Sequence, residues 1–182
     1  MAIALTDFSG FCGFRPLKEI VNFIETVPEF ENVLGGSAAD QFTKAVSTAS
    51  SADALSRNAK SMKSSPSDEV VQLQKALKTL FEALMNADPE QSVKPQVQAL
   101  VARYQKETGK LQSRDMKESS IEELVVRLNE QFPHDVGIFC SYLLNVVTLQ
   151  PGQAVFLEAN EPHAYLSGRK CLSLLQIIRV QN

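Results

Sequence analysis

Apolar side chains recur every three or four residues over most of this 182-residue chain, which predicts amphipathic helices rather than strands. The apolar stripes fall at residues 17–27, 42–46, 70–84, 93–104 and 121–128. Pro16 suits the first position of a helix, Pro28 is expected to end that helix, and Asp88-Pro89 should separate two later ones. The stripes are too short, and their flanking charges too irregular, for a coiled coil, so we expect a small bundle that packs on itself.

Serine marks two of the expected helix starts. Ser37 with Asp40 resembles a capping box that leads into Phe42. Ser119 or Ser120, each followed three residues later by a glutamate, should open the last long helix. Residues 47–67 are also rich in serine, and there we expect a mobile connection within the helical region.

After residue 132 the pattern changes from helical to extended. Asp135 can cap a short buried helix over residues 136–145. Two strand-like runs follow, Val146–Leu149 and Ala154–Leu157, with Pro151-Gly152 placed between them as in a type II turn. This arrangement predicts a β-hairpin.

One of only two histidines, His163, lies just beyond that hairpin, between Pro162 and Ala164. It could be a metal ligand, an acid–base group or a hydrogen-bonded turn residue, and spacing alone favours the turn residue. A metal site needs three or four donors. Glu158 and Glu161 flank His163, whereas the other histidine, His134, suits the lead-in to a helix. The residues alone therefore predict a helical bundle joined to a β-element with one histidine of open role.

Composition excludes some classes of function. An apolar fraction of 44%, a charged fraction of 21% and a net charge of −3 are typical of a soluble protein and give no footprint for nucleic acid. No apolar run approaches the roughly 18–20 residues of a membrane span, and the start lacks the features of a signal peptide. Cys12, Cys140 and Cys171 form no CxxC pair, so we expect a reduced cytoplasmic setting with Cys12 and Cys140 as buried thiols.

Three segments resemble, in order and spacing, the type I mannose-6-phosphate isomerases, also called phosphomannose isomerases. They are MAIALTDFSGFCGFRP (1–16), FPHDVGIFCSYLLNVVTL (132–149) and PGQAVFLEANEPHAYLSG (151–168). The resemblance runs from residue 1 to about residue 168 and covers the middle of the family's longer chain. It implies an α+β fold in which a mainly helical domain is inserted into part of a cupin-type β-barrel. The implied divisions are barrel strands at 1–15, the helical domain at 16–130, a return to the barrel at 131–168 and a divergent tail at 169–182.

The resemblance also implies a function. The family interconverts mannose 6-phosphate and fructose 6-phosphate, supplies GDP-mannose synthesis and uses one zinc ion. Its pattern maps a zinc ligand onto His163 and a residue that lines the sugar-phosphate pocket onto Tyr165. Aldose–ketose isomerisation passes through an enediol-like intermediate, whose charge a Lewis acid beside the sugar oxygens stabilises. We expect a monomer whose partner is a sugar phosphate, with neither nucleic acid nor membrane bound.

The chain departs from the family's pattern on both sides. The other zinc ligands that the resemblance implies, a Gln, a His and a Glu, precede the match to Met1 and have no counterpart here. In the tail, Arg169 stands where an Asp is usual and Leu172 where a substrate-contacting Glu is usual, and the family's catalytic arginine has no counterpart. We therefore assign no catalytic residue and expect this truncated chain to be inactive alone.

An incomplete barrel has consequences for the strands. We expect residues 1–5 and 11–14 to be short extended pieces joined by a turn at 7–10. Residues 1–5 and the hairpin within 146–166 should lack neighbours. Residues 172–180 would add one strand or helix, or form an aggregation-prone end. The alternative functions are a non-catalytic helical fragment that binds a partner, such as the full-length enzyme, and an unstable truncated product.

Overall fold

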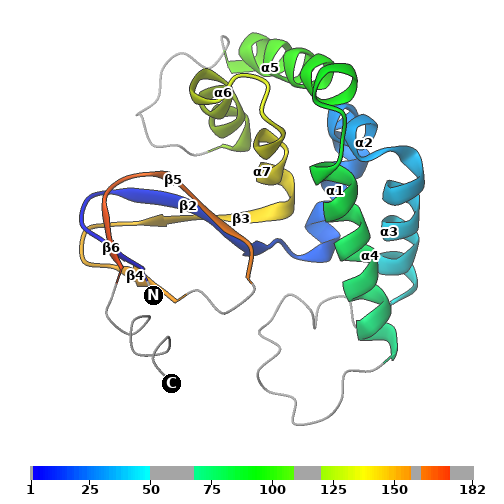
Figure 1. Ribbon diagram of the computed structural model, residues 1–182, viewed down its shortest axis with the longest axis horizontal. Helices are drawn as coiled ribbons and strands as arrows, with labels where there is room; N and C mark the ends of the chain where they lie inside the picture. Colours follow the sequence, from blue (N-terminus) through cyan, green and yellow to red (C-terminus); the bar gives the residue numbers. More distant parts are fainter. Residues whose placement is uncertain (1, 50–67, 109–119, 157–160, 173–182) are drawn as a thin grey trace. The chain divides into compact units, whose positions relative to one another are not determined.

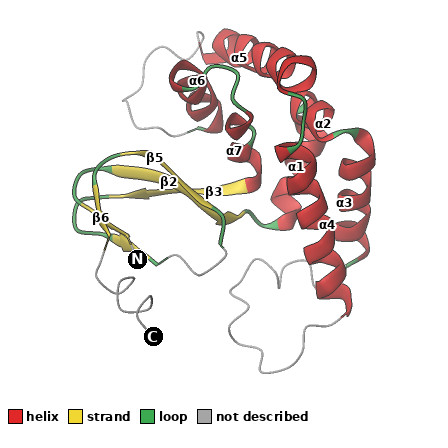
Figure 2. Ribbon diagram, viewed as in Figure 1, coloured by secondary structure: helices red, strands yellow, loops and turns green. Residues whose placement is uncertain are grey.

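The chain divides into two compact units in the computed structural model, which describes residues 2–49, 68–108, 120–156 and 161–172 (Figure 1). Unit 1 consists of residues 1–14 and 144–182, and unit 2 of residues 15–143. All strands that the structure describes lie in unit 1, and all described helices lie in unit 2 (Figure 2). The fold is therefore a mixture of helix and sheet, as the α+β expectation requires, with the two kinds of structure segregated.

The elements described in unit 2 are helices and single helical turns. They are α1 (Leu17–Thr26), α2 (Pro28–Leu34), α3 (Gly36–Thr48), α4 (Asp68–Met85), the π-helical turn η2 (Pro89–Val93), α5 (Lys94–Thr108), α6 (Ile121–Gln131), the 3₁₀ turn η3 (Val136–Ile138) and α7 (Cys140–Leu143). The helical stripes are buried as the spacing predicts, including Leu73, Leu77, Leu80, Leu84, Val93, Val97, Leu100, Val101, Leu124, Val125 and Leu128. Two predicted boundaries are also confirmed. The Asp88 carboxylate accepts from the amides that open η2, and the Ser120 hydroxyl accepts from the Glu123 amide at the start of α6.

Other helix boundaries differ from the expected ones. Pro28 opens α2, where its missing N–H costs nothing, in addition to following the end of α1. The capping box expected at Ser37 is wrong, because α3 begins one residue earlier and Gly35, with φ 75°, precedes it without a side-chain cap. The helix expected over 136–145 is broken into η3 and α7 and ends at Leu143. Residues 50–67, which hold most of the serine-rich segment, lie outside the described residues.

Tyr142 of α7 joins the last helical segment to the core of unit 2. Its ring is fully buried and lies 5.1 Å from the ring of Phe30 and 5.2 Å from that of Phe23, measured between centroids. Its hydroxyl lies 3.0 Å from the hydroxyl of Tyr104 in α5, so two buried polar groups satisfy each other. This packing accounts for the grouping of residues 131–143 with the helices, whereas the family resemblance implies a return to the barrel at residue 131.

Unit 1 contains two antiparallel three-stranded sheets. Its strands are β1 (Ala2–Ala4), β2 (Phe8–Phe14), β3 (Leu144–Leu149), β4 (Ala154–Val155), β5 (His163–Ser167) and β6 (Lys170–Leu172). One sheet has the order β4-β1-β6 and the other the order β3-β2-β5 (Figure 1). Within the described residues these are two separate open sheets, and a closed cupin barrel is not seen.

The hairpin expected between residues 146–149 and 154–157 is wrong. The type II turn itself forms, since the Gln153 amide donates to the Gln150 carbonyl at 3.0 Å and Gly152 has a φ of 86°. The flanking strands, however, belong to different sheets, because β3 pairs with β2 and β4 pairs with β1. The Gly152 amide bonds to the Ala4 carbonyl of β1, so the turn carries the chain from one sheet to the other.

The expectation that residues 1–5 lack neighbours is also wrong. β1 is the central strand of its sheet, with β4 on one side and β6 on the other. β2 is likewise central, and it already begins at Phe8, inside the expected turn. β6 comes from the divergent tail, whose residues 170–172 pair with β1, while residues 173–182 lie outside the described residues.

An ion pair between α2 and α5 makes the stability of unit 2 depend on pH. Arg103 donates from Nε and Nη2 to the two oxygens of the Glu29 carboxylate, at 3.0 and 2.6 Å. Burial raises the pKa of Glu29, but the hydrogen bonds and charge of Arg103 outweigh that effect and hold the pKa below the ordinary value of 4.5. A lowered carboxyl pKa stabilises the fold above the unfolded value, and this stability is lost as the pH falls through the folded value.

We therefore predict that Glu29→Gln lowers the free energy of unfolding at pH 7 by about 1–3 kcal/mol. The difference in free energy of unfolding between variant and wild type should narrow as the pH falls below about 4.5 and through the lower folded pKa, because the unfolded chain binds a proton at Glu29 before the folded chain does. Urea unfolding followed by helical circular dichroism at several pH values measures both quantities. Glu82→Gln, which alters a solvent-exposed pair with Lys78, is the control and should change little at either pH. If the difference in free energy of unfolding between Glu29→Gln and wild type stayed constant with pH, the prediction would be contradicted.

Candidate metal and sugar-phosphate site

β5 brings His163 and Tyr165 together on one face of the β3-β2-β5 sheet. Its register on β2 places Cys12 opposite His163 and Gly10 opposite Tyr165. Residues directly opposite share a face, as do alternate residues of one strand, so Phe8 of β2 belongs to the same face. The two residues that the family resemblance singles out are therefore neighbours, even though both are solvent-exposed.

Tyr165 is held by aromatic contacts. Its ring meets the ring of Phe8 edge-on at a centroid distance of 5.6 Å and the ring of His163 at 5.8 Å. Gly10 makes room for this cluster, because a Cβ there would lie 2.8 Å from the Ala164 carbonyl oxygen and 3.2 Å from the Phe8 ring. Tyr165 is oriented by these rings while 41% of its surface stays exposed.

His163 has its ring orientation set by its own turn. Nδ1 lies 2.9 Å from the Glu161 backbone oxygen. A carbonyl oxygen can only accept, so Nδ1 carries the hydrogen, and in the neutral ring the lone pair is then on Nε2. Metal-binding histidines usually have this arrangement, with one ring nitrogen donating to a carbonyl and the other binding the metal.

Cys12 lies beside His163 as a partly buried thiol. The Gly13 amide donates to the Pro162 carbonyl at 2.9 Å, so Cys12 and His163 form the closer, non-hydrogen-bonded type of antiparallel pair. Burial, and then the negative charge of Glu161, raise the pKa of the Cys12 thiol. The second predicted thiol, Cys140, is buried in unit 2, where burial and then the charge of Asp135 raise its pKa to about 12.

The described residues do not complete a metal site around His163. Among them, no group of three or more His, Cys, Asp or Glu side chains is arranged to hold an ion. Glu158 lies outside the described residues. His134 belongs to unit 2, where it follows α6 with a left-handed φ of 63° and its amide donates to Asn129. The ring arrangement of His163 is compatible with metal binding, but the part of the chain that the structure describes adds no group of three donors to it.

Comparison with known proteins identifies the family. Residues 33–144, well over half of the chain, match the family model of the phosphomannose isomerase type I helical insertion domain. The chain belongs to the type I phosphomannose isomerase family. This confirms the resemblance that the three sequence segments indicate.

Curated relatives match along nearly the whole chain. It is 41% identical over 171 residues to the mannose-6-phosphate isomerase of Candida glabrata, covering 92% of this chain and 35% of that protein. It is 41% identical over 168 residues to the mannose-6-phosphate isomerase of Rattus norvegicus, and the match covers 92% of this chain and 34% of that protein. The chain thus spans about a third of the length of these relatives.

A solved structure of the family agrees with the fold. The Salmonella typhimurium mannose 6-phosphate isomerase, bound to fructose 6-phosphate and zinc, matches with a TM-score of 0.58 and 27% identity, covering 93% of this chain and 32% of that one. The described fold therefore resembles that of this isomerase along nearly the whole chain.

Sequence reasoning missed the residues that orient the site. The pattern of apolar positions does not indicate that Phe8 contacts Tyr165. It also does not indicate that Gly10 must be small for these side chains to fit. A glycine within a strand is a general signal for close approach by another group, and Gly10 sits in the strand segment FSGFCGF.

No helix among the described residues is long and apolar enough to cross a membrane.

We predict that Gly10→Ala disturbs this face. The new methyl group would press on the Ala164 carbonyl and the Phe8 ring, which should lower the free energy of unfolding by about 1–3 kcal/mol. Gly36→Ala is the matched control, because that glycine is helical with nothing within 4 Å of an added Cβ, and it should be neutral or slightly stabilising. Thermal unfolding measures both effects. Equal changes in stability for the two variants would show that the added methyl group at Gly10 does not press on Ala164 and Phe8.

Proposed function

We propose that the chain is part of a zinc-dependent mannose-6-phosphate isomerase, in which it supplies His163 as one zinc ligand and Tyr165 as a wall of the sugar-phosphate pocket. The observation that carries this proposal is the 41% identity to mannose-6-phosphate isomerases along 92% of the chain. The reaction would interconvert mannose 6-phosphate and fructose 6-phosphate and so supply GDP-mannose synthesis.

Each residue has a role that suits its surroundings. His163 would present Nε2 to the zinc ion, because its Nδ1 is engaged by the Glu161 carbonyl. Tyr165 would offer its ring edge and hydroxyl to the sugar phosphate while Phe8 keeps the ring in place. Placing both on a strand rather than a loop favours a precise geometry.

Activity requires more than residues 1–182 provide. One imidazole does not bind zinc selectively, and the described residues hold no cluster of three donors. The remaining ligands and the catalytic arginine implied by the family pattern have no counterpart in this sequence. We therefore expect the chain alone to be inactive, and the complete enzyme to be a cytoplasmic monomer with a cupin barrel.

A segment exchange tests the proposal. Residues 1–168 of this chain would replace the matching segment of the rat enzyme, which is 41% identical over 168 residues. We predict that the chimera interconverts mannose 6-phosphate and fructose 6-phosphate with chelator-sensitive turnover. His163→Ala in the chimera should lower kcat/KM by at least about 100-fold, because a zinc ligand is lost. Residues 1–182 alone should give no turnover with added zinc.

His134→Asn is the matched control in the same chimera. It replaces the other histidine, which has a left-handed backbone that asparagine also tolerates, and activity should be retained. A folded chimera without activity, or one in which the two histidine variants behave alike, would contradict the proposed role of His163. Chelator-sensitive turnover by residues 1–182 alone would contradict the expected inactivity.

A further inference from the structure

A β-bulge in β2 lies between Asn145 and His163. The ladder with β3 pairs Phe11 with Val146 and Phe14 with Leu144, so β2 has one extra residue opposite Asn145. Gly13 lies within the bulge with a φ of 66°, a left-handed conformation that glycine adopts without strain. The bulge therefore requires a glycine, and it redirects β2 at the residue that follows Cys12.

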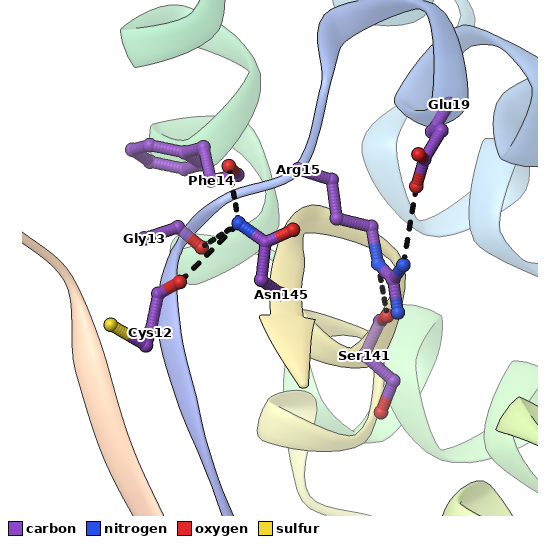
Figure 3. A network of polar contacts seen from close by, with 7 residues as sticks. All are labelled: Cys12, Gly13, Phe14, Arg15, Glu19, Ser141 and Asn145. Carbon is purple, nitrogen blue, oxygen red and sulfur yellow. Dashed lines mark hydrogen bonds and ion pairs between the residues drawn. The ribbon is translucent and has the colours of Figure 1, made fainter. Parts of the chain in front are cut away.

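Asn145 stabilises the bulge from the β3 side. Its amide nitrogen lies 2.7 Å from the Phe14 carbonyl oxygen, 3.3 Å from that of Cys12 and 3.5 Å from that of Gly13 (Figure 3). An amide has two hydrogens, so the bonds to Phe14 and Cys12 are the effective ones. They span the bulge from end to end, and Figure 3 shows the Cys12 side chain pointing away from Asn145.

The other side of the bulge holds the turn that leads into His163. The Gly13 amide donates to the Pro162 carbonyl at 2.9 Å. A Cβ on Gly13 would lie 2.5 Å from Glu161 Oε1, so the Glu161 side chain lies against this glycine and would have to shift if the residue carried a side chain. The backbone oxygen of this same Glu161 accepts from Nδ1 of His163.

We propose that Asn145 and Gly13 are positioning residues that act through the Glu161–Pro162 turn to hold the His163 ring with Nδ1 donating and Nε2 directed to a ligand. The inference rests on the proposed function for its purpose, since a fixed Nε2 matters only if His163 binds a metal. The chain of contacts runs across all three strands of one sheet within unit 1, from β3 through the bulge in β2 to β5. Neither residue touches the reacting atoms in this arrangement.

The position of the ring proton tests the inference directly. ¹⁵N–¹³C correlation spectra of residues 1–182, recorded where both imidazoles are neutral, report the tautomer of each histidine separately. His163 of the wild-type chain should carry its hydrogen on Nδ1. Asn145→Asp puts a carboxylate against the three bulge carbonyls, and Gly13→Asn keeps the left-handed backbone accessible while its Cβ meets Glu161. Both variants should shift His163 to a mixture of tautomers and leave His134 unchanged.

Asn129→Asp is the matched control, because it makes the same chemical change at an asparagine of unit 2 that accepts from the His134 amide. It should leave the His163 tautomer unchanged. If Asn145→Asp fails to fold, Gly13→Asn decides the matter. A wild-type His163 with its hydrogen on Nε2, or folded variants with an unchanged tautomer, would overturn the positioning role.

A zinc titration of the rat-enzyme chimera carrying the same substitutions, in which the remaining ligands are present, separates this inference from the proposed function. Zinc should shift the Nε2 resonance of wild-type His163, with an apparent affinity about tenfold lower in Asn145→Asp and Gly13→Asn than in Asn129→Asp. If zinc leaves wild-type His163 unperturbed while the tautomer responds to the variants, the zinc role of this chain fails and the positioning role stands. If zinc binds equally to all forms and the tautomer is constant, the positioning role fails and the zinc role stands.

Discussion

The β2–β3 ladder closes at the point where the helical unit is inserted. Phe14, the last residue before unit 2, pairs with Leu144, the first residue after it. Within unit 2, the Arg15 amide donates to the Leu143 carbonyl at 2.8 Å and the Arg15 guanidinium to the Ser141 carbonyl at 3.1 Å (Figure 3). The long segment therefore begins and ends between paired residues. An insertion of this kind leaves the sheet intact, because the closure cost rises slowly with loop length.

The candidate site depends on the same strand. β2 is hydrogen-bonded on both sides, so its bulge is held from β3 and in turn shapes the approach to β5. His163 and Tyr165 lie on a strand next to this central element, which explains how two exposed side chains keep a defined orientation. Their ring contacts and the turn at Glu161 add to this restraint.

Local signals predicted the helical unit well. The stripes that bury Leu80, Leu100 and Val125 follow from the spacing of apolar residues, and the caps at Asp88 and Ser120 follow from side chains near their own amides. Family motifs led to His163 and Tyr165, whereas spacing alone left the role of His163 open. The strand partners could not be predicted in this way. A type II turn between two extended runs usually joins a hairpin, but here the run before it pairs with β2 and the run after it with β1.

The sequence by itself determined the long helical stripes, the helix starts at Asp88 and Ser120 and the turn at Pro151-Gly152, because each depends on residues a few positions apart. Only the tertiary structure decided which strands pair and why Gly10 and Gly13 lack side chains. Those features depend on contacts between distant parts of the chain, such as the bond from Asn145 to Phe14, which spans 131 positions. The order of apolar and polar residues along the chain does not predict such contacts, since they form only once the sheet has brought its strands together.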